Sequence, residues 1–472
     1  MDLLSPPLID RILGEAFELL ERTGIRLQCA EAAQLLSAAG ARFEGERAFL
    51  PFSLVERTLA SVPHEFTLHN RDGSPAVHYG GGVHFDPGSC AVHILEPHTN
   101  AHRDAQSADL VRLVQVAEQL PQFAAQSTAV VCHDCPPTVP GDLYRLVLVL
   151  QHSNKPVITG AFSTETLPAM IHLLAVDAGA GMVDYVAMRR NPRAVFDVCP
   201  SPPLFWTDFA ARNLIDLARA GLPAQIVSMP LAGAAAPVTL VGAITQHAAE
   251  CLSGITIHQL AAPGAPIVWG GAPAIFDMRT AAAPMGAMET AMICASYAQV
   301  GKHLGLPTHA YLGASDAKLI DAQAGLESGM TALVGALAGI NLISGAGMLD
   351  FLACQSVEKL VIDAEGIAIT QRLLQGVRSD YPTLALEAFA AAGPAGDFLK
   401  LPETRRLFRQ EQYLPSKVID RTSIRAWQDA GSPDAAARAN ARVNELVASY
   451  RRPTLPPALA SELERLASGP SE

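Results

Sequence analysis

Aromatic side chains at the ends of predicted strands carry the most specific chemistry in this sequence. Trp206 follows one short apolar run, and Trp269 and Tyr311 each lie within another. A quaternary ammonium cannot donate a hydrogen bond, but an aromatic ring face stabilises it by about 0.5 to 2 kcal/mol. If the fold brings these rings together, they form a site for such a cation. The alternative is that both tryptophans fill the layer between strands and helices.

Acidic and imidazole side chains near other strand ends extend this candidate site. Asp86 ends an apolar run, while His133 and Asp316 each follow one. A carboxylate at such a position would offset the charge of a bound cation. Asp316 also precedes a helical stretch, so helix capping is its alternative role. We predict that six residues bind substrate, and we assign no catalytic residue: Asp86, His133, Trp206, Trp269, Tyr311 and Asp316.

The run Cys132, His133, Asp134 and Cys135 is the best metal candidate in the chain. Two thiolates and an imidazole resemble part of a zinc site, and zinc-activated thiolates are one route to methyl transfer. However, no second pair of cysteines or histidines follows at metal-ligand spacing. We therefore predict reduced thiols at a strand end and no bound metal, with a zinc-thiolate methyltransferase as the alternative.

Short apolar runs separated by longer helical stretches must position these residues. Eight such runs recur, and continuous apolar runs are typical of parallel strands that are buried on both faces. Their spacing suits one strand, one helix and two loops per repeat. The pattern favours an α/β fold of the TIM (β/α)8 barrel type, in which ligands bind at the C-terminal strand ends. A doubly wound open sheet is the alternative. The runs are 83–95, 124–131, 156–162, 194–199, 225–229, 266–270, 309–313 and 341–345.

Helical patterns flank the predicted barrel on both sides. Apolar residues recur at helical spacing near the start of the chain, and polar helical sequence follows the last repeat. We predict an N-terminal helical appendage at 1–75, a TIM-barrel catalytic domain at 76–375 and a C-terminal helical extension at 376–472.

Composition excludes several classes of partner. The formal net charge of -12 provides no cationic field for nucleic acid or for an anionic membrane surface. No signal peptide and no apolar run of 18 residues or more is present, so we expect a soluble cytoplasmic protein. The acidic balance is compatible with a homo-oligomer.

Long ordered stretches in the second half of the chain resemble the trimethylamine methyltransferase family. The resemblance implies a TIM-barrel enzyme that passes a methyl group from a methylated amine to the Co(I) centre of a corrinoid. The sequence has no D-x-H-x-x-G element for ligating cobalt, so we expect the corrinoid, a cobalamin, to be carried by a partner protein and not held tightly by this chain. The stretches are 228–260, 263–280, 315–329, 337–350 and 356–365.

This chain differs from the founding members of that family because every residue is a standard amino acid. Their pyrrolysine chemistry therefore cannot be carried over. Pyrrolysine-free relatives demethylate quaternary amines such as glycine betaine. The resemblance therefore implies a small quaternary amine, glycine betaine or a similar compound, as the substrate here. In the tail element 398–411, Lys400 and Glu403 stand where the family commonly has histidines. A betaine-binding or corrinoid-docking barrel without catalytic activity is a further alternative.

Overall fold

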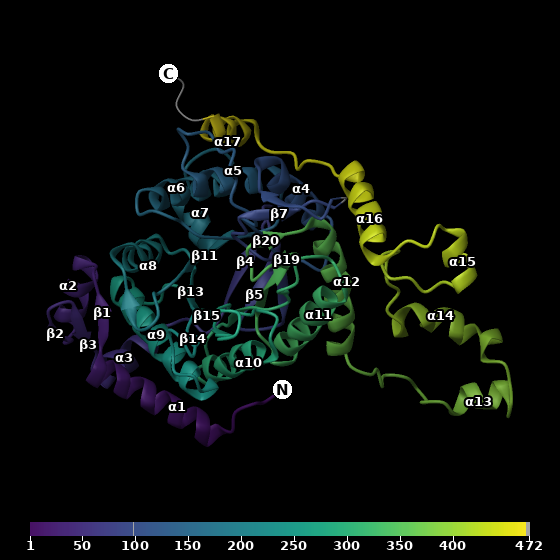
Figure 1. Cartoon of the computed structure of the whole chain (residues 1–472), viewed down its shortest axis with the longest axis horizontal. Coiled ribbons are helices and arrows are strands. Elements are labelled where there is room, and N and C mark those ends of the chain that lie inside the picture. Colours follow the sequence, from purple (N-terminus) through teal and green to yellow (C-terminus); the bar gives the residue numbers. More distant parts are fainter. Residues whose placement is uncertain (98, 469–472) are drawn as a thin grey trace.

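Eight parallel strands form a closed barrel at the centre of the molecule (Figure 1). The computed structural model describes residues 1–97 and 99–468. Each predicted run overlaps one barrel strand, which confirms the TIM barrel, and the open-sheet alternative is wrong. The strands are β6 (His84–Pro87), β9 (Gln126–Ser127), β10 (Val157–Thr159), β11 (Ala194–Val198), β13 (Ala224–Ser228), β15 (Ile267–Gly271), β17 (His309–Tyr311) and β18 (Leu342–Ala346).

Two contacts close the barrel between its larger and smaller groups of paired strands. The pairing order is β15, β13, β11, β10, β9 in one group and β17, β18, β6 in the other. Trp269 on β15 bridges to Thr308 next to β17, and the amide of Ala124 next to β9 donates to the carbonyl of Phe85 on β6 at 2.9 Å. The lumen is therefore enclosed on all sides.

A helix covers the outside of the barrel after each strand. The ends of these helices carry ordinary start and stop signals. For example, the hydroxyl of Thr207 caps the first turn of α8, and Gly221 ends that helix in the left-handed conformation. The eight covering helices are α4 (Ser107–Glu118), α5 (Gly141–His152), α6 (Thr166–Ala178), α8 (Asp208–Ala220), α9 (Leu240–Ala261), α10 (Met288–His303), α11 (Ala322–Leu337) and α12 (Val357–Leu374), and a short α7 (Tyr185–Arg190) precedes β11.

A hairpin of β4 (Phe66–His69) and β5 (Pro75–Tyr79) closes one end of the lumen. Its inward side chains Leu68, Val77 and Tyr79 are fully buried against residues from the barrel strands. The hairpin begins within the segment 1–75, so the end of the predicted appendage contributes to the barrel floor. A ligand must therefore enter from the opposite end, where the strands terminate.

The N-terminal segment contains short strands as well as the predicted helices. Strand β1 pairs in parallel with β12 (Phe205–Trp206), which ties the appendage to the loop after β11. Helices α1 and α3 pack on α9. The elements are α1 (Pro6–Glu18), a π-helical turn (Leu19–Thr23), β1 (Ile25–Leu27), α2 (Ala30–Ala38), β2 (Arg42–Glu44), β3 (Arg47–Phe49) and α3 (Phe52–Leu59).

Small sheets lie at the open end of the barrel. One has the order β19, β20, β7, β8, and another pairs β14 with β16. The prediction that residues 91–95 belong to the first barrel strand is wrong, because β7 pairs with β20 and β8 instead. The strands are β7 (His93–Leu95), β8 (His102–Asp104), β14 (Leu231–Ala232), β16 (Ala274–Ile275), β19 (Met348–Leu349) and β20 (Cys354–Gln355).

The C-terminal segment is helical, and part of it projects away from the barrel (Figure 1). Helices α13, α14 and α15 bury no side chain, whereas α16 packs on α4 and α12, and α17 packs on α5. Across the described residues, no helix is long and apolar enough to cross a membrane. The elements are α13 (Leu386–Ala392), a 3-10 turn (Phe398–Lys400), α14 (Pro402–Glu411), α15 (Ile424–Asp429), α16 (Ala435–Ser449) and α17 (Pro457–Ser468).

Candidate functional site

Two carboxyl groups lie inside the barrel, on strands β6 and β11. Val195 on β11 packs against the hairpin floor, and alternation along the strand directs Asp197 into the lumen as well. Asp86 on β6 is fully buried and accepts a hydrogen bond from Ser344 on β18 at 2.5 Å. The lumen therefore has an acidic centre above an apolar floor.

Asp197 is held in place by hydrogen bonds to both of its carboxylate oxygens. The Tyr311 hydroxyl donates to Oδ2 at 2.9 Å, and the Gln225 amide donates to Oδ1 at 2.6 Å. Ser89 lies 2.9 Å from the Tyr311 hydroxyl, and Tyr79 from the floor donates to Gln225 at 3.1 Å. This arrangement fixes the carboxylate and uses side chains from four different elements.

Asp86 belongs to a second chain of contacts that reaches a buried histidine. Ser344 donates to Asp86, and Nε2 of His309 lies 3.0 Å from the same Ser344 hydroxyl. Burial lowers the pKa of His309 to about 3, so this ring is neutral. Burial also raises the pKa of Asp86 well above its usual range, with the negative charge of Asp197 adding to the effect. Burial therefore favours the protonated form of Asp86.

No side-chain cation neutralises this acidic centre. Among the described residues, no lysine or arginine forms an ion pair with Asp86 or Asp197. Asp197 keeps some accessible surface, and Cys199, two residues along, is exposed. The chain therefore does not cover the Asp197 carboxylate completely.

The titration of Asp197 predicts a pH-dependent affinity for cations. Burial raises the pKa of Asp197 to about 6, despite the hydrogen bonds from Tyr311 and Gln225, which lower it. Below that pH the group is protonated and neutral, so we expect the affinity for a permanent cation to fall by about tenfold per pH unit. Calorimetric titration of a quaternary amine between pH 5 and pH 8 measures this, and an affinity independent of pH contradicts it.

The same raised pKa makes the ligand-free protein less stable as the pH rises, whereas the affinity for a cation increases. The folded state binds this proton more tightly than the unfolded chain, so the stabilising contribution is complete below pH 3.8 and is lost as the pH rises through about 6. A bound cation should remove that loss, since it favours the ionised carboxylate.

The mouth around Tyr311 is apolar. Val227, Ala274 and Met285 are buried beside Tyr311, and Leu352 packs on the same group. These apolar side chains lower the polarity around Tyr311, which strengthens electrostatic interactions there.

The predicted aromatic cage is wrong, because Trp206 and Trp269 do not face the lumen. Both are fully buried between barrel and helices, where they donate to the Ser253 hydroxyl at 2.9 Å and the Tyr297 carbonyl at 3.0 Å. On β15, Val268 points to the floor cluster, so alternation directs its neighbour Trp269 outward. Only Tyr311 of the three aromatic residues lies with the acidic centre.

Asp316 and His133 occupy loops outside the lumen cluster. Asp316 accepts hydrogen bonds from the amides of Met285 and Gly286 at 2.8 and 3.0 Å, which joins two mouth loops. Asp321 is the residue that caps α11, so the capping alternative for Asp316 is also wrong. His133 is exposed and its Nδ1 lies 3.2 Å from the Ala105 carbonyl. The structure brings Asp86 and Tyr311 together with Asp197, but not these two.

Cys132 and Cys135, the two thiols near His133, are a buried and a half-buried residue of one loop. Burial raises the pKa of Cys132 to about 12, so it stays a thiol, and Cys135 donates to the Val139 carbonyl at 3.3 Å. Within residues 1–97 and 99–468, no three His, Cys, Asp or Glu side chains are grouped so that they could hold a metal ion. The zinc-thiolate alternative therefore has no geometry to support it.

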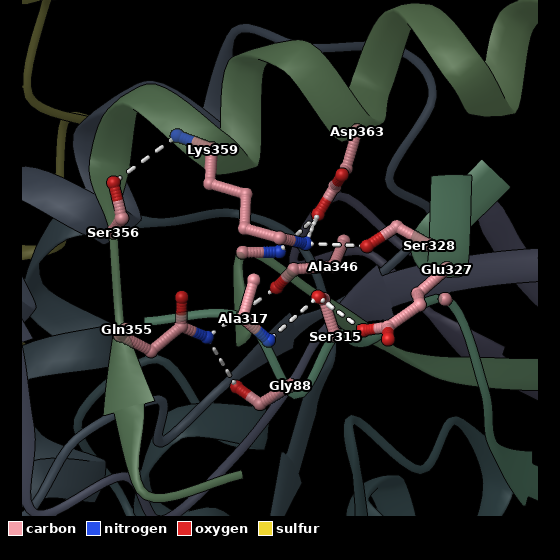
Figure 2. A network of polar contacts seen from close by, with 12 residues as sticks. Gly88, Ser315, Ala317, Glu327, Ser328, Ala346, Gln355, Ser356, Lys359 and Asp363 are labelled. Carbon is pink, nitrogen blue, oxygen red and sulfur yellow. Dashed lines mark hydrogen bonds and ion pairs between the residues drawn. The ribbon is translucent and has the colours of Figure 1, made fainter. Parts of the chain in front are cut away.

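A polar network ties α11 and α12 to the loops at the mouth (Figure 2). The ammonium of Lys359 lies 2.6 Å from both Asp363 and Ser328, and Asp363 also accepts the amide of Gly347 at 2.7 Å. Glu327 accepts a hydrogen bond from Ser315 at 2.6 Å. These polar groups are paired within the chain, so the contacts hold the loops after β17 and β18 in place.

Replacing Lys359 by methionine should lower the free energy of unfolding by about 3 to 5 kcal/mol, because Asp363 loses its partner in a buried ion pair. Burial already raises the pKa of Asp363, and Lys359 opposes that rise. In the variant, the folded state holds this proton more tightly, so the loss should be larger at pH 8 than at pH 5. Urea unfolding at both pH values measures it.

Lys318→Met provides a control for the Lys359 variant, since Lys318 is half exposed in its ion pair with Asp350. Surface pairs contribute about 0 to 1 kcal/mol. Equal losses for the two variants, or a loss that does not depend on pH for Lys359→Met, would contradict the burial argument.

Four residues of the lumen centre were missed by sequence reasoning. Asp197, Gln225, His309 and Ser344 are polar residues within otherwise apolar strands. This interruption was the available signal, because a polar side chain in a strand buried on both faces must point to a functional or hydrogen-bonded interior.

Comparisons with known proteins agree with the barrel fold. The family model described as trimethylamine methyltransferase (MTTB) matches residues 1–468. The trimethylamine methyltransferase MttB1 of Methanosarcina mazei is 32% identical over 92% of this chain and 88% of its own length. The glycine betaine methyltransferase of Desulfitobacterium hafniense is 28% identical over 98% of this chain and 96% of its own length. The crystal structure of the Methanosarcina barkeri monomethylamine methyltransferase MtmB matches with a TM-score of 0.51 and 13% identity, covering 93% of this chain and 87% of that one.

Proposed function

Because this chain belongs to the trimethylamine methyltransferase family, a family of methyltransferases, we propose that it transfers a methyl group from a quaternary amine to the Co(I) corrinoid of a separate protein. Glycine betaine or a similar betaine is the proposed donor. The observation that carries the quaternary amine is the carboxylate of Asp197, fixed by Tyr311 and Gln225 without a side-chain cation beside it.

Charge complementarity supports a donor that is a cation at every pH. The ionised Asp197 attracts the ammonium, and the ring of Tyr311, which is 7% exposed, can contribute a cation–π contact. Asp86, whose raised pKa favours its neutral form, does not add a second negative charge that would need a partner. One carboxylate therefore matches one positive charge.

The chemistry that a quaternary amine requires agrees with what the lumen offers. As the carbon–nitrogen bond breaks, the nitrogen keeps the electron pair and leaves as a neutral tertiary amine, so no acid or base has to move a proton. The corrinoid supplies the nucleophile that takes the methyl group. The chain must hold the donor in one orientation and exclude water, and the fixed carboxylate and the apolar rim around Met285 serve these two purposes.

A direct test mixes the purified protein with a reduced corrinoid protein and a panel of donors. Glycine betaine, carnitine, choline and trimethylamine are each added while the cobalt absorption spectrum is recorded. We expect methylation of the corrinoid with at least one quaternary amine. Methylation with trimethylamine alone would contradict the proposed substrate class, and binding of a betaine without methyl transfer would favour the binding-barrel alternative.

A further inference from the structure

One buried arginine near the mouth has no carboxylate partner. Arg145 on α5 is 1% exposed, yet no carboxylate of the described chain forms an ion pair with it. The buried Arg193 and the partly buried Arg71 differ in this respect, because both pair with Asp177. A buried charge without a counter-ion is costly and needs an explanation.

The contacts of Arg145 satisfy only part of its guanidinium. Nη1 donates to the Thr128 carbonyl at 3.2 Å and lies 3.5 Å from the Cys90 sulfur, and Nε lies 3.4 Å from the Gly141 carbonyl. The ring of Phe162 lies 4.5 Å from the guanidinium carbon. The remaining nitrogen, Nη2, is buried and has no hydrogen-bond partner among the described residues.

Acidic side chains close in sequence are committed elsewhere. Asp142, one helical turn away, accepts hydrogen bonds from the amides of Leu143 and Phe162 at 3.0 and 2.6 Å. Asp134 accepts the amide and hydroxyl of Ser107 at 2.7 and 2.8 Å. Neither carboxylate contacts Arg145, so the guanidinium keeps a buried donor without a partner among the described residues.

A short chain of contacts connects Arg145 to the acidic centre. Asp197 accepts from Tyr311, whose hydroxyl lies 2.9 Å from Ser89, and the next residue, Cys90, contacts Arg145. Thr128 follows β9, and Phe162, which is 54% exposed, follows β10. Arg145 thus lies beneath the strand-end loops on the side of the mouth that Ser89 and Tyr311 border.

We infer that Arg145 binds the carboxylate of a zwitterionic betaine whose ammonium lies beside Asp197. This inference rests on the proposed function and adds the residue that binds the carboxylate of the donor. A ligand with both charges meets one fixed anion and one unpaired cation, whereas choline and trimethylamine leave Nη2 unpartnered. A carboxylate bound by a guanidinium is also held in a defined direction, which orients the ammonium at the other end of the molecule.

The test compares Arg145→Gln with the wild-type enzyme, using glycine betaine, γ-butyrobetaine and choline as donors and calorimetry alongside the methyl-transfer assay. We expect the variant to bind the preferred betaine about 10- to 100-fold more weakly while its affinity for choline stays within about twofold. The wild-type enzyme should prefer a betaine over choline by a similar factor, a measurement that does not depend on folding of the variant. Arg145→Lys should retain part of the preference.

Arg452→Gln is the matched control, because Arg452 donates to the Gln151 carbonyl at the end of the same helix and lies outside the lumen. It should leave the preference unchanged. Equal weakening of betaine and choline by Arg145→Gln, or a wild-type enzyme that does not distinguish them, would overturn the carboxylate site while leaving methyl transfer intact. Failure of the wild-type enzyme to bind or demethylate any quaternary amine would overturn the proposed function and this inference together.

Discussion

Replacing Asp197 by asparagine is expected to reduce kcat/KM for methyl transfer from a quaternary amine by about 100- to 5,000-fold. Removing one partner of a buried ion pair costs about 3 to 5 kcal/mol, and here the other partner is the substrate cation. The variant should fold, because an asparagine has nearly the same shape and can still accept a hydrogen bond. The hydroxyls of Tyr311 and Ser89, which lie 2.9 Å apart, can reverse their direction to satisfy it.

The measurement should separate charge from shape. Calorimetry with choline and with 3,3-dimethylbutanol, its uncharged carbon isostere, gives that separation, since only choline should lose affinity in the Asp197→Asn variant. Asp316→Asn is a suitable control, because the pKa of Asp316 is also raised by burial to about 6 although this residue lies outside the lumen centre. Equal loss of affinity for both ligands would show that Asp197 acts through packing, and unchanged affinity for choline would place the cation elsewhere.

The barrel could be predicted from the sequence because its strands are buried on both faces. Each strand appears as a continuous apolar run, and the loops between runs contain turn residues, so no long-range information is needed. The run 91–95 has the same appearance as a barrel strand, but β7 takes its partners from β8 and β20. That choice depends on residues more than 200 positions away in the case of β20, and a local pattern does not contain it.

The short strands of the N-terminal segment were missed for a related reason. β1, β2 and β3 each have three residues. β1 pairs in parallel with Phe205 and Trp206, which lie in the loop after β11. Three residues show no clear alternation, so the helical signals around them dominate the sequence pattern. Pairing with a distant loop is what stabilises them as strands.

Which residues face the lumen depends on a difference of one position along a strand. Asp86 and Tyr311 were predicted and do lie at the acidic centre, whereas Trp269 stands one residue from the inward-facing Val268. Apolar runs carry no alternation that would distinguish the two faces, so large aromatic residues could be assigned to either. Asp197 carried this signal although it was missed, since a carboxylate within a buried strand needs hydrogen-bond partners, and these lie in the lumen.

The outward positions of the two tryptophans lead to a prediction about stability. Trp269→Ala and Trp206→Ala are each expected to lower the free energy of unfolding by about 3 to 5 kcal/mol, because each leaves a large cavity between barrel and helix. Gly301 and Gly254 face these rings so closely that an added methyl group would lie 2.6 Å from ring atoms. Such tight packing leaves little room for the surroundings to relax. Denaturant unfolding, monitored by circular dichroism, measures the loss.

Substrate affinity provides the other half of this test. Since neither indole faces the acidic centre, the fraction of either variant that remains folded should bind a quaternary amine with wild-type affinity. Trp427→Ala is the control, because Trp427 is only partly buried in the C-terminal segment and donates to the Pro433 carbonyl at 2.9 Å. Its replacement should cost less stability than either barrel tryptophan. Wild-type stability combined with lost affinity in Trp206→Ala or Trp269→Ala would restore the aromatic cage, and it would remove the basis for placing the ammonium beside Asp197.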